Sequence, residues 1–452
     1  MLKTLVSIII ISNYLIAIDP FERSKFSSTN NFFLNERRLT SEYPFLGLNE
    51  LLPKDDSTLY LGYNFKSIIS NNFPNLTAGF YLSGNLGSIK YLIEPVITSY
   101  NHKIVEIGFD YSRNNFSASI INAFIEAKFN NFTLYFGKFP IFWGKSTNNS
   151  LIQSGKFPAY DNVLLKFSKY KFSYDMMFGQ LNSITNDDNI TINRNISGHR
   201  LNFDLAKNLN VGFGEQIIYT GENRSIDLKY LNPYVPYFSH GLKKPDLDKY
   251  TDNDNSIIFL DISYTQSSKL NYYSEFIIDD FQIDETNAPN SIGLKIGMNK
   301  TINYDKSIKL FFNFEYTKIN KWTYLHHGEF TSWHNYDYSL GNYYGPDAES
   351  LDFKSIFSIL NKFDVLLDFG QLAKGQNHIN SEWDPFLNDY EMKKYFYSSI
   401  SIVFSKDWGN LEIGYSTKEH LDGMVLKNID YISRPSVYLK IIYNNQSEIF
   451  LK

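Results

Sequence analysis

The stretch from Phe132 to Phe167 reads FTLYFGKFP, IFWGKSTNNSLIQSGKFPAYD and NVLLKF, and it decides the fold. Both of its ends alternate apolar and polar residues at period two, which is typical of a β-strand whose two faces meet different environments. Between the ends lies a connection of about twenty residues, a length that is uncommon in loops without a function. We interpret the stretch as one hairpin of a transmembrane β-barrel, with the long connection on the outer side of the membrane.

The same alternation recurs from Thr58 to the end of the chain. Segments of about nine to eleven residues match the length of a tilted strand that crosses a bilayer. The pattern therefore predicts an all-β fold, a transmembrane antiparallel barrel of about eighteen strands. These strands are expected near 58–67, 76–84, 88–99, 116–128, 132–140, 162–169, 171–181, 198–206, 209–219, 256–265, 269–279, 291–299, 307–317, 352–360, 363–371, 394–404, 410–418 and 435–444.

Connection length depends on position in this series. The turns after even-numbered strands are short, whereas almost every connection after an odd-numbered strand is long. Short periplasmic turns and long external loops are typical of outer-membrane barrels, and a soluble β-sandwich has no cause to separate them in this way. Residues Lys103–Tyr111 also alternate, so an additional strand there stays open. The long connections are predicted at 100–115, 141–161, 182–197, 220–255, 280–290, 318–351, 372–393 and 419–434.

The composition agrees with a barrel. Hydrophobic residues make up 43% of the chain, yet no interior run reaches the eighteen or so apolar residues that a membrane helix needs. The 38 Phe and 34 Tyr residues suit the aromatic girdles of a barrel, although an aromatic-rich β-sandwich or propeller is an alternative. A net charge of −5 gives no argument for nucleic acid as a partner. The absence of cysteine excludes disulfides and thiolate metal sites.

The N-terminus has the features of an export signal. Lys3 supplies the positive charge, Leu5 to Ile16 form an apolar core, and Ala17 is a small residue at the expected cleavage point. The predicted organisation is a signal peptide at 1–17, a short N-terminal periplasmic segment at 18–57 and the barrel at 58–452. The expected location is the outer membrane of a Gram-negative-type bacterium.

Motifs of catalysis are missing from the chain. It contains no G-x-S-x-G elbow, no H-E-x-x-H and no P-loop. The neighbouring residues His326 and His327 would point apart on a strand, and residues 252–254 lack the glycine and the distal glutamate of a calcium loop. We therefore predict no catalytic residue, no metal site and no cofactor.

The external connections place aromatic residues beside carboxylates and amides. A flat ring covers the apolar face of a sugar, while Asp, Asn and Gln bind its hydroxyl groups. The alternative for a Trp near a strand end is a place in the interfacial girdle. The candidate glycan-binding residues are Trp143, Asp161, Asp280, Gln282, Trp333 and Asp347, and the residues expected to shape the loops are Gly144, Pro233, Gly345 and Pro346.

Four patches of the chain resemble motifs of the Wzi-type capsule assembly family of outer-membrane barrels. The segment 137–144 (GKFPIFWG), followed by Ser150-Leu151, is similar to the family's G-R-x-P-x-x-W-G and S-L, with Lys138 where an Arg is usual. The other patches are LNP at 231–233, EFIIDDFQ at 275–282 and LGNYYGPDAESL at 340–351. The resemblance implies a barrel of about this strand number and a glycan-binding role without enzymatic activity.

These observations predict a barrel that binds an acidic or neutral surface polysaccharide and supports capsule assembly or retention. Its expected partners are the surface polysaccharide, outer-membrane lipid and the capsule export machinery. A diffusion porin is the alternative, because a barrel of sixteen to eighteen strands can enclose an aqueous channel. In such a porin, the residues that line the channel would be Lys66, Lys90, Lys295 and Lys309. A purely structural envelope barrel is a third hypothesis.

Overall fold

The computed structural model describes the strands and most of the residues that connect them. The described residues are 56–70, 75–99, 111–113, 116–146, 149–232, 235–237, 254–267, 270–280, 289–304, 307–326, 329–336, 338–360, 362–379, 381, 391–406, 409–417 and 436–450. The predicted signal peptide and almost all of the predicted N-terminal segment lie outside these residues, so both boundaries stay predictions.

Among the described residues, eighteen long strands form the wall, as the alternation predicts. Each of the eighteen overlaps one of the predicted segments. The first nine are β1 (Thr58–Ser70), β2 (Asn75–Asn85), β3 (Ile89–Ser99), β5 (Phe116–Phe129), β6 (Phe132–Phe139), β9 (Tyr160–Lys169), β10 (Phe172–Gln180), β12 (Thr191–Ala206) and β13 (Leu209–Glu222). The other nine are β14 (Asn255–Ser267), β15 (Leu270–Asp280), β16 (Ser291–Asn303), β17 (Ile308–Ile319), β20 (Ala348–Ile359), β21 (Phe363–Lys374), β22 (Lys393–Lys406), β23 (Gly409–Ser416) and β24 (Ser436–Phe450).

The described parts of the connections contain only short elements. Among the described residues, no helix is long and apolar enough to cross a membrane. The short elements are β4 (Tyr111–Arg113), β7 (Phe142–Trp143), β8 (Gln153–Ser154), β11 (Ile184–Thr185), η3 (Leu228–Leu231), η4 (Glu329–Thr331), β18 (His334–Asn335) and β19 (Tyr338–Ser339).

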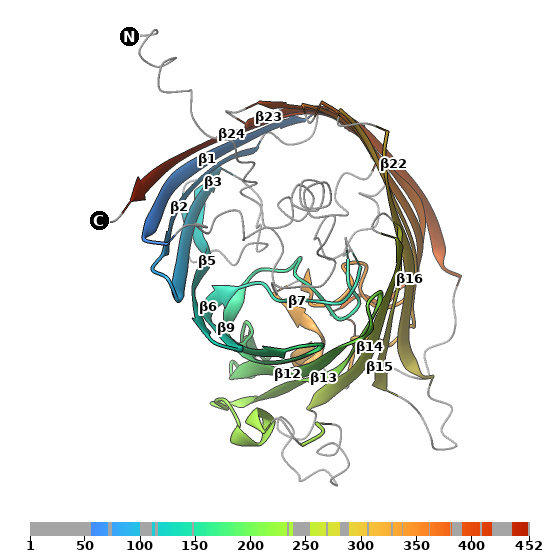
Figure 1. The fold of residues 1–452 in the computed structure, drawn as a ribbon. Coiled ribbons are helices and arrows are strands. Elements are labelled where there is room, and N and C mark those ends of the chain that lie inside the picture. Colours follow the sequence, from blue (N-terminus) through green and yellow to red (C-terminus); the bar gives the residue numbers. More distant parts are fainter. Residues whose placement is uncertain are drawn as a thin grey trace.

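The wall strands close into a ring (Figure 1). Each pairs antiparallel with the next wall strand along the chain, and β1 pairs with β24 from Thr58 opposite Phe450 to Ser70 opposite Tyr438. Closure leaves no edge strand, so the ladders satisfy the backbone N–H and C=O groups of the wall without water. The prediction of an antiparallel barrel is therefore confirmed.

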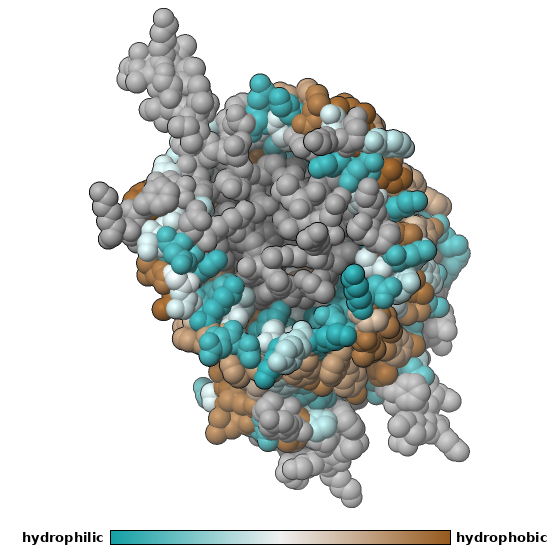
Figure 2. Space-filling view, in the orientation of Figure 1, coloured by the Kyte–Doolittle hydropathy of each residue, from teal (hydrophilic) through white to brown (hydrophobic). Residues whose placement is uncertain are grey.

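Strand β16 shows how the sequence fits the two sides of this wall. Its side chains alternate between buried residues that face the lumen, such as Lys295 and Asn299, and apolar residues that face outward, such as Ile296, which is 51% exposed. Figure 2 shows hydrophobic residues around the outer wall and hydrophilic residues near the rim of the opening. This arrangement is expected where one face of each strand meets lipid and the other a polar interior.

The observed connections also separate by length. The short turns are 86–88, 130–131, 170–171, 207–208 and 268–269. The long connections are 140–159, 223–254 and 320–347. In the segment Lys103–Tyr111, which left the strand count open, residues 103–110 lie outside the described part. Strand β4 starts at Tyr111 and adds only a short ladder to β5. Thus β4 is no nineteenth wall strand.

The last strand is longer than the sequence indicates. It was expected to end at Asn444, but β24 continues to Phe450. The extra residues are needed because Thr58 to Asn64 of β1 pair with residues 444–450. The wall therefore ends on an aromatic residue.

Candidate functional site

Two long connections fold into the barrel and form what we call the lumenal plug. It consists of the described residues of 140–159, between β6 and β9, and of 320–347, between β17 and β20. Each connection contains a short hairpin, β7–β8 in the first and β18–β19 in the second. Figure 1 shows β7 inside the ring, on the side of β12 to β14.

Hydrogen bonds join the two connections. The backbone N–H of Ser154 donates to the carbonyl of Leu340 at 2.9 Å, and the hydroxyl of Tyr324 donates to the carbonyl of Leu151 at 2.6 Å. Gly341 makes the second contact possible, because a Cβ there would lie 2.5 Å from both of these oxygen atoms. The two connections therefore form one packed body.

Aromatic side chains fill the interior of this body. Trp143 and Trp333 are each 1% exposed and belong to one hydrophobic cluster. The indole of Trp143 lies 5.9 Å from the ring of Phe259, and a Cβ at Gly198 would lie 3.0 Å from it. Protein atoms cover both indoles, so a direct contact of either ring with sugar needs a movement of the plug.

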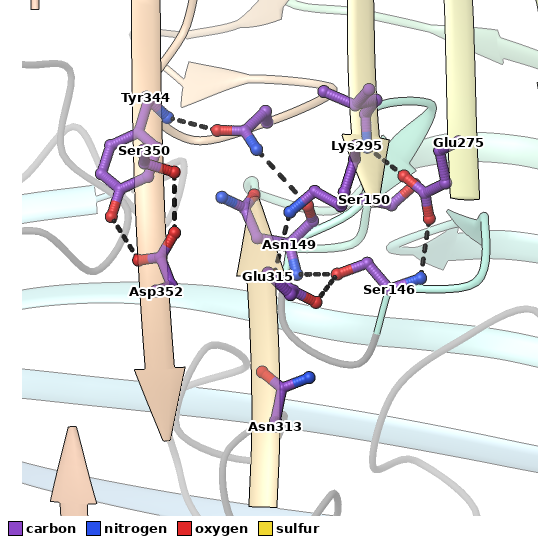
Figure 3. Close-up of polar contacts among 12 residues, drawn as sticks. Ser146, Asn149, Ser150, Glu275, Lys295, Asn313, Glu315, Tyr344, Ser350 and Asp352 are labelled. Carbon is purple, nitrogen blue, oxygen red and sulfur yellow. Dashed lines mark hydrogen bonds and ion pairs between the residues drawn. The ribbon is translucent and has the colours of Figure 1, made fainter. Parts of the chain in front are cut away.

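Glu275 on β15 anchors the first connection. Its carboxylate accepts hydrogen bonds from the backbone N–H groups of Lys145 at 2.6 Å, Ser146 at 2.7 Å and Leu151 at 2.6 Å. Figure 3 shows this carboxylate beside the turn of the plug. Gly144 has a φ of 133°, and a Cβ there would lie 2.4 Å from Glu275 Oε1. Only glycine allows the turn to approach the carboxylate this closely.

A second wall carboxylate lies under the same turn. Glu315 on β17 accepts a hydrogen bond from the hydroxyl of Ser146 at 2.6 Å and forms an ion pair with Lys295 at 3.0 Å (Figure 3). Lys295 faces the lumen, as expected, but it is only 1% exposed. The hypothesis that Lys295 lines a water-filled channel is therefore wrong, because the plug covers it.

Lys145 inserts into a third group of wall residues. Its ammonium lies 3.1 Å from Asp261 Oδ1, and Arg200 donates to both oxygens of Asp261 at 2.8 Å. This pair crosses the lumenal face of β13 at Gly212, where a Cβ would lie 2.6 Å from the carboxylate. Burial lowers the pKa of Lys145, and the charge of Asp261 opposes that shift.

Different wall residues anchor the second connection. Arg194 on β12 is fully buried and donates to the carbonyls of Phe330 at 2.6 Å, Ser332 at 2.7 Å and His334 at 3.1 Å. Lys374 on β21 donates to the carbonyl of Pro346. Each cation therefore provides a hydrogen-bond donor to carbonyl groups of the second connection inside the barrel.

Tyrosines surround Asp352 where the plug meets β20 and β22. Asp352 accepts hydrogen bonds from the hydroxyls of Tyr344 at 3.0 Å and Ser350 at 2.7 Å, and from that of Tyr397 (Figure 3). Burial raises the pKa of Tyr344 well above its usual value. Tyr343 and Tyr395 are half-buried and pack against this cluster. No sequence motif singled out these tyrosines, which come from two segments that are far apart in the chain.

The remaining predicted site residues are dispersed. Asp161 is exposed on the outer face of β9, Asp280 is half-buried at the end of β15, and Asp347 is 7% exposed beside Lys374. Gln282 and Pro233 lie outside the described residues. Gly345 has a φ of 68°, as expected for a loop-shaping glycine, and Pro346 is buried. The structure unites Trp143 and Trp333 but does not bring either of them together with Asp161.

The plug explains why the motif patches are far apart in the sequence. The first patch supplies Gly144 and Ser150-Leu151, the third supplies Glu275, and the fourth supplies Gly341. All of them meet where the plug touches the wall. Within the described residues, no group of three or more His, Cys, Asp or Glu residues is placed to hold a metal ion.

The fold and the site define an outer-membrane β-barrel whose lumen holds a plug made from its own connections. Residues 62–422 match the family described as capsule assembly protein Wzi, so the chain belongs to that family. The protein is accordingly a Gram-negative outer-membrane protein. The comparison with curated proteins gives no match.

A solved outer-membrane barrel shares the fold. The chain is similar to Wzi of Escherichia coli, described as a carbohydrate-binding β-barrel involved in group 1 capsule assembly, with a TM-score of 0.59 and 13% identity over 84% of this chain and 83% of that one. It is also similar to OccD3 of Pseudomonas aeruginosa, with a TM-score of 0.47 and 10% identity over 86% and 91% of the two chains. OprD of the same organism is similar with a TM-score of 0.46 and 10% identity over 87% of this chain and 96% of that one.

Proposed function

We propose that this barrel binds a surface polysaccharide at its outer end and supports capsule assembly or retention. The observation that carries the proposal is the family match together with a plug that is fixed to the wall by Glu275, Glu315 and Arg194. A connection held by several buried charged groups suits a rigid binding platform better than a freely permeable channel. The similar barrel of Escherichia coli is described as carbohydrate-binding, which supports the same role.

The ligand is a polysaccharide chain, and its contacts are divided between two sets of residues. Half-buried Tyr343 and Tyr395 offer ring edges and faces beside the carboxylate of Asp352, which is the combination that sugars require. Asp161 and Asp280 extend the surface at the outer ends of β9 and β15, and Gln282 stays a candidate from the sequence alone. In this proposal the buried indoles of the plug support the platform from below.

Cells that lack the protein provide the test. We expect deletion to lower the amount of cell-bound polysaccharide and to raise the amount released into the medium. Complementation with Tyr343→Ala/Tyr395→Ala should restore barrel assembly but not retention. The matched control is Tyr170→Ala, because Tyr170 is 95% exposed in a short turn at the opposite end of the barrel. Unchanged cell-bound polysaccharide after deletion would refute the proposed function.

A further inference from the structure

A polar pair interrupts the apolar outer face of the wall. His199 on β12 and Glu215 on β13 are paired across the ladder, and His199 Nε2 lies 3.0 Å from Glu215 Oε1. Both point outward, because Glu215 has the same parity as Phe213, which is 50% exposed on the lipid side. On the neighbouring strand β14, the residue opposite Glu215 is the apolar Ile258.

The depth of this pair follows from strand geometry. Glu215 is six residues beyond Leu209, where β13 leaves its periplasmic turn. At about 3.3 Å per residue and a tilt of about 40°, that places it roughly 15 Å along the barrel axis. The lipid-facing band of such barrels is about 25 Å tall. The pair therefore lies at a depth where acyl chains would surround it if nothing covered it.

Part of the next connection covers the pair from outside. We call this part the outer strap and define it as the described residues 223–232 and 235–237. The backbone N–H of Tyr237 donates to Glu215 Oε1 at 2.7 Å, and the ring of Tyr237 lies 4.7 Å from that of His199. Figure 1 shows the short yellow-green helix of the strap outside the ring, beyond β12 and β13.

Further contacts hold the strap against the wall. The ring of Tyr230 lies 4.7 Å from that of Tyr219, which faces outward on β13 and is fully buried. At the start of the strap, Arg224 donates to both oxygens of Asp254, at 2.7 Å and 3.0 Å. The strap therefore descends along the wall from the outer end of β13 to the level of Glu215.

The strap exposes two large apolar side chains among the polar residues Asn223, Ser225 and Asn232. Ile226 is 49% exposed and Leu228 is 78% exposed, and the side chain of Lys229 is 40% exposed beside them. Below the strap, the outer face continues with Phe213 and with Leu260, which is 37% exposed. Tyr219, against which Tyr230 of the strap packs, is ten residues beyond Leu209, so the same geometry places it roughly 25 Å along the barrel axis, at the outer edge of the lipid-facing band.

We propose that the outer strap lies in the outer leaflet of the membrane and contacts its lipids through Ile226 and Leu228. The lipid is the occupant that fits, because the surface is an extension of the band that the acyl chains already cover. Lys229 then lies near the headgroups, as is usual for cations beside an apolar surface. This inference is independent of polysaccharide binding.

Site-directed spin labelling tests the inference. The chain contains no cysteine, so Leu228→Cys gives a single labelling site. The labelled barrel is reconstituted in vesicles of lipopolysaccharide and phospholipid, and its accessibility to oxygen and to a nickel chelate is measured by power saturation. We expect the oxygen-to-nickel accessibility ratio at residue 228 to be several-fold higher than at Asp188→Cys, an exposed site in an external connection.

Two further labels calibrate the result. Leu260→Cys on β14 marks the lipid-facing wall, and Ile226→Cys should repeat the behaviour of residue 228. All of these sites are exposed, so the substitutions leave the core unchanged. A ratio at residues 226 and 228 equal to that at residue 188 would overturn the proposal, because it would place the strap in water.

Discussion

Replacement of Glu275 by alanine should release the first connection of the plug and leave the wall intact. The substitution removes the acceptor of three backbone N–H groups, those of Lys145, Ser146 and Leu151. A hydrogen bond to a charged group contributes about 1.5 to 3 kcal/mol. Three such bonds at the low end give about 4.5 kcal/mol, since the removal of one acceptor leaves three buried donors without a partner. The ladders of β15 to β14 and β16 are backbone interactions and are unaffected.

Hydrogen exchange followed by mass spectrometry measures this effect. These amides exchange when the plug opens locally. A decrease of about 4.5 kcal/mol in the free energy of that opening raises their exchange rate about a thousandfold, since about 1.4 kcal/mol corresponds to a factor of ten. Glu222→Ala is the matched control, because this carboxylate is exposed at the end of β13. Exchange in 145–151 that stays within tenfold of the wild type would refute the assignment of Glu275 as an anchor. A concurrent rise in single-channel conductance would show that the plug obstructs the lumen.

Three other substitutions separate the contributions of the remaining anchors. Arg194→Ala removes the donor of three buried carbonyl groups, so residues 330–334 should become accessible to protease while the barrel stays heat-modifiable. Lys145→Met should lower the stability of the plug less than Glu275→Ala does, because Asp261 keeps both of its hydrogen bonds from Arg200, and an equal loss would contradict this. Gly144→Ala should resemble Glu275→Ala in hydrogen exchange, because its Cβ would displace the carboxylate.

The wall was predictable because lipid and lumen impose opposite demands on alternate residues. Prediction failed where a strand leaves this environment. At residues 444–446, Asn-Asn-Gln breaks the alternation, and only the pairing with β1 shows that β24 continues. Strand β12 begins at Thr191 instead of residue 198, because Asn195 and Ser197 lie on an outward face that is buried. Polar residues are tolerated there, so the pattern of a lipid-facing strand is absent.

The plug was not predictable from the same pattern. An indole beside a carboxylate in a long connection is compatible both with an exposed sugar site and with a buried core. The difference depends on whether the connection turns inward, and this is decided by wall residues more than a hundred positions away, such as Glu275 for Leu151 and Arg194 for Ser332. The sequence offered one signal of an inward-turned connection, a carboxylate at an inward-facing position in the middle of a strand. Such a residue does not show which connection it binds.

The contacts of the motif patches also bear on how polysaccharide specificity arises. Gly144, Ser150 and Leu151 are engaged with Glu275, and Gly341 is packed against Tyr324 and Leu151. These residues are occupied in holding the plug to the wall, so the resemblance to the family concerns a shared platform. The choice among polysaccharides must then depend on side chains that remain accessible on that platform. On this argument, exchange of Tyr343 and Tyr395 should alter which polysaccharide is retained, whereas changes in the motif patches should reduce the retention of every polysaccharide alike.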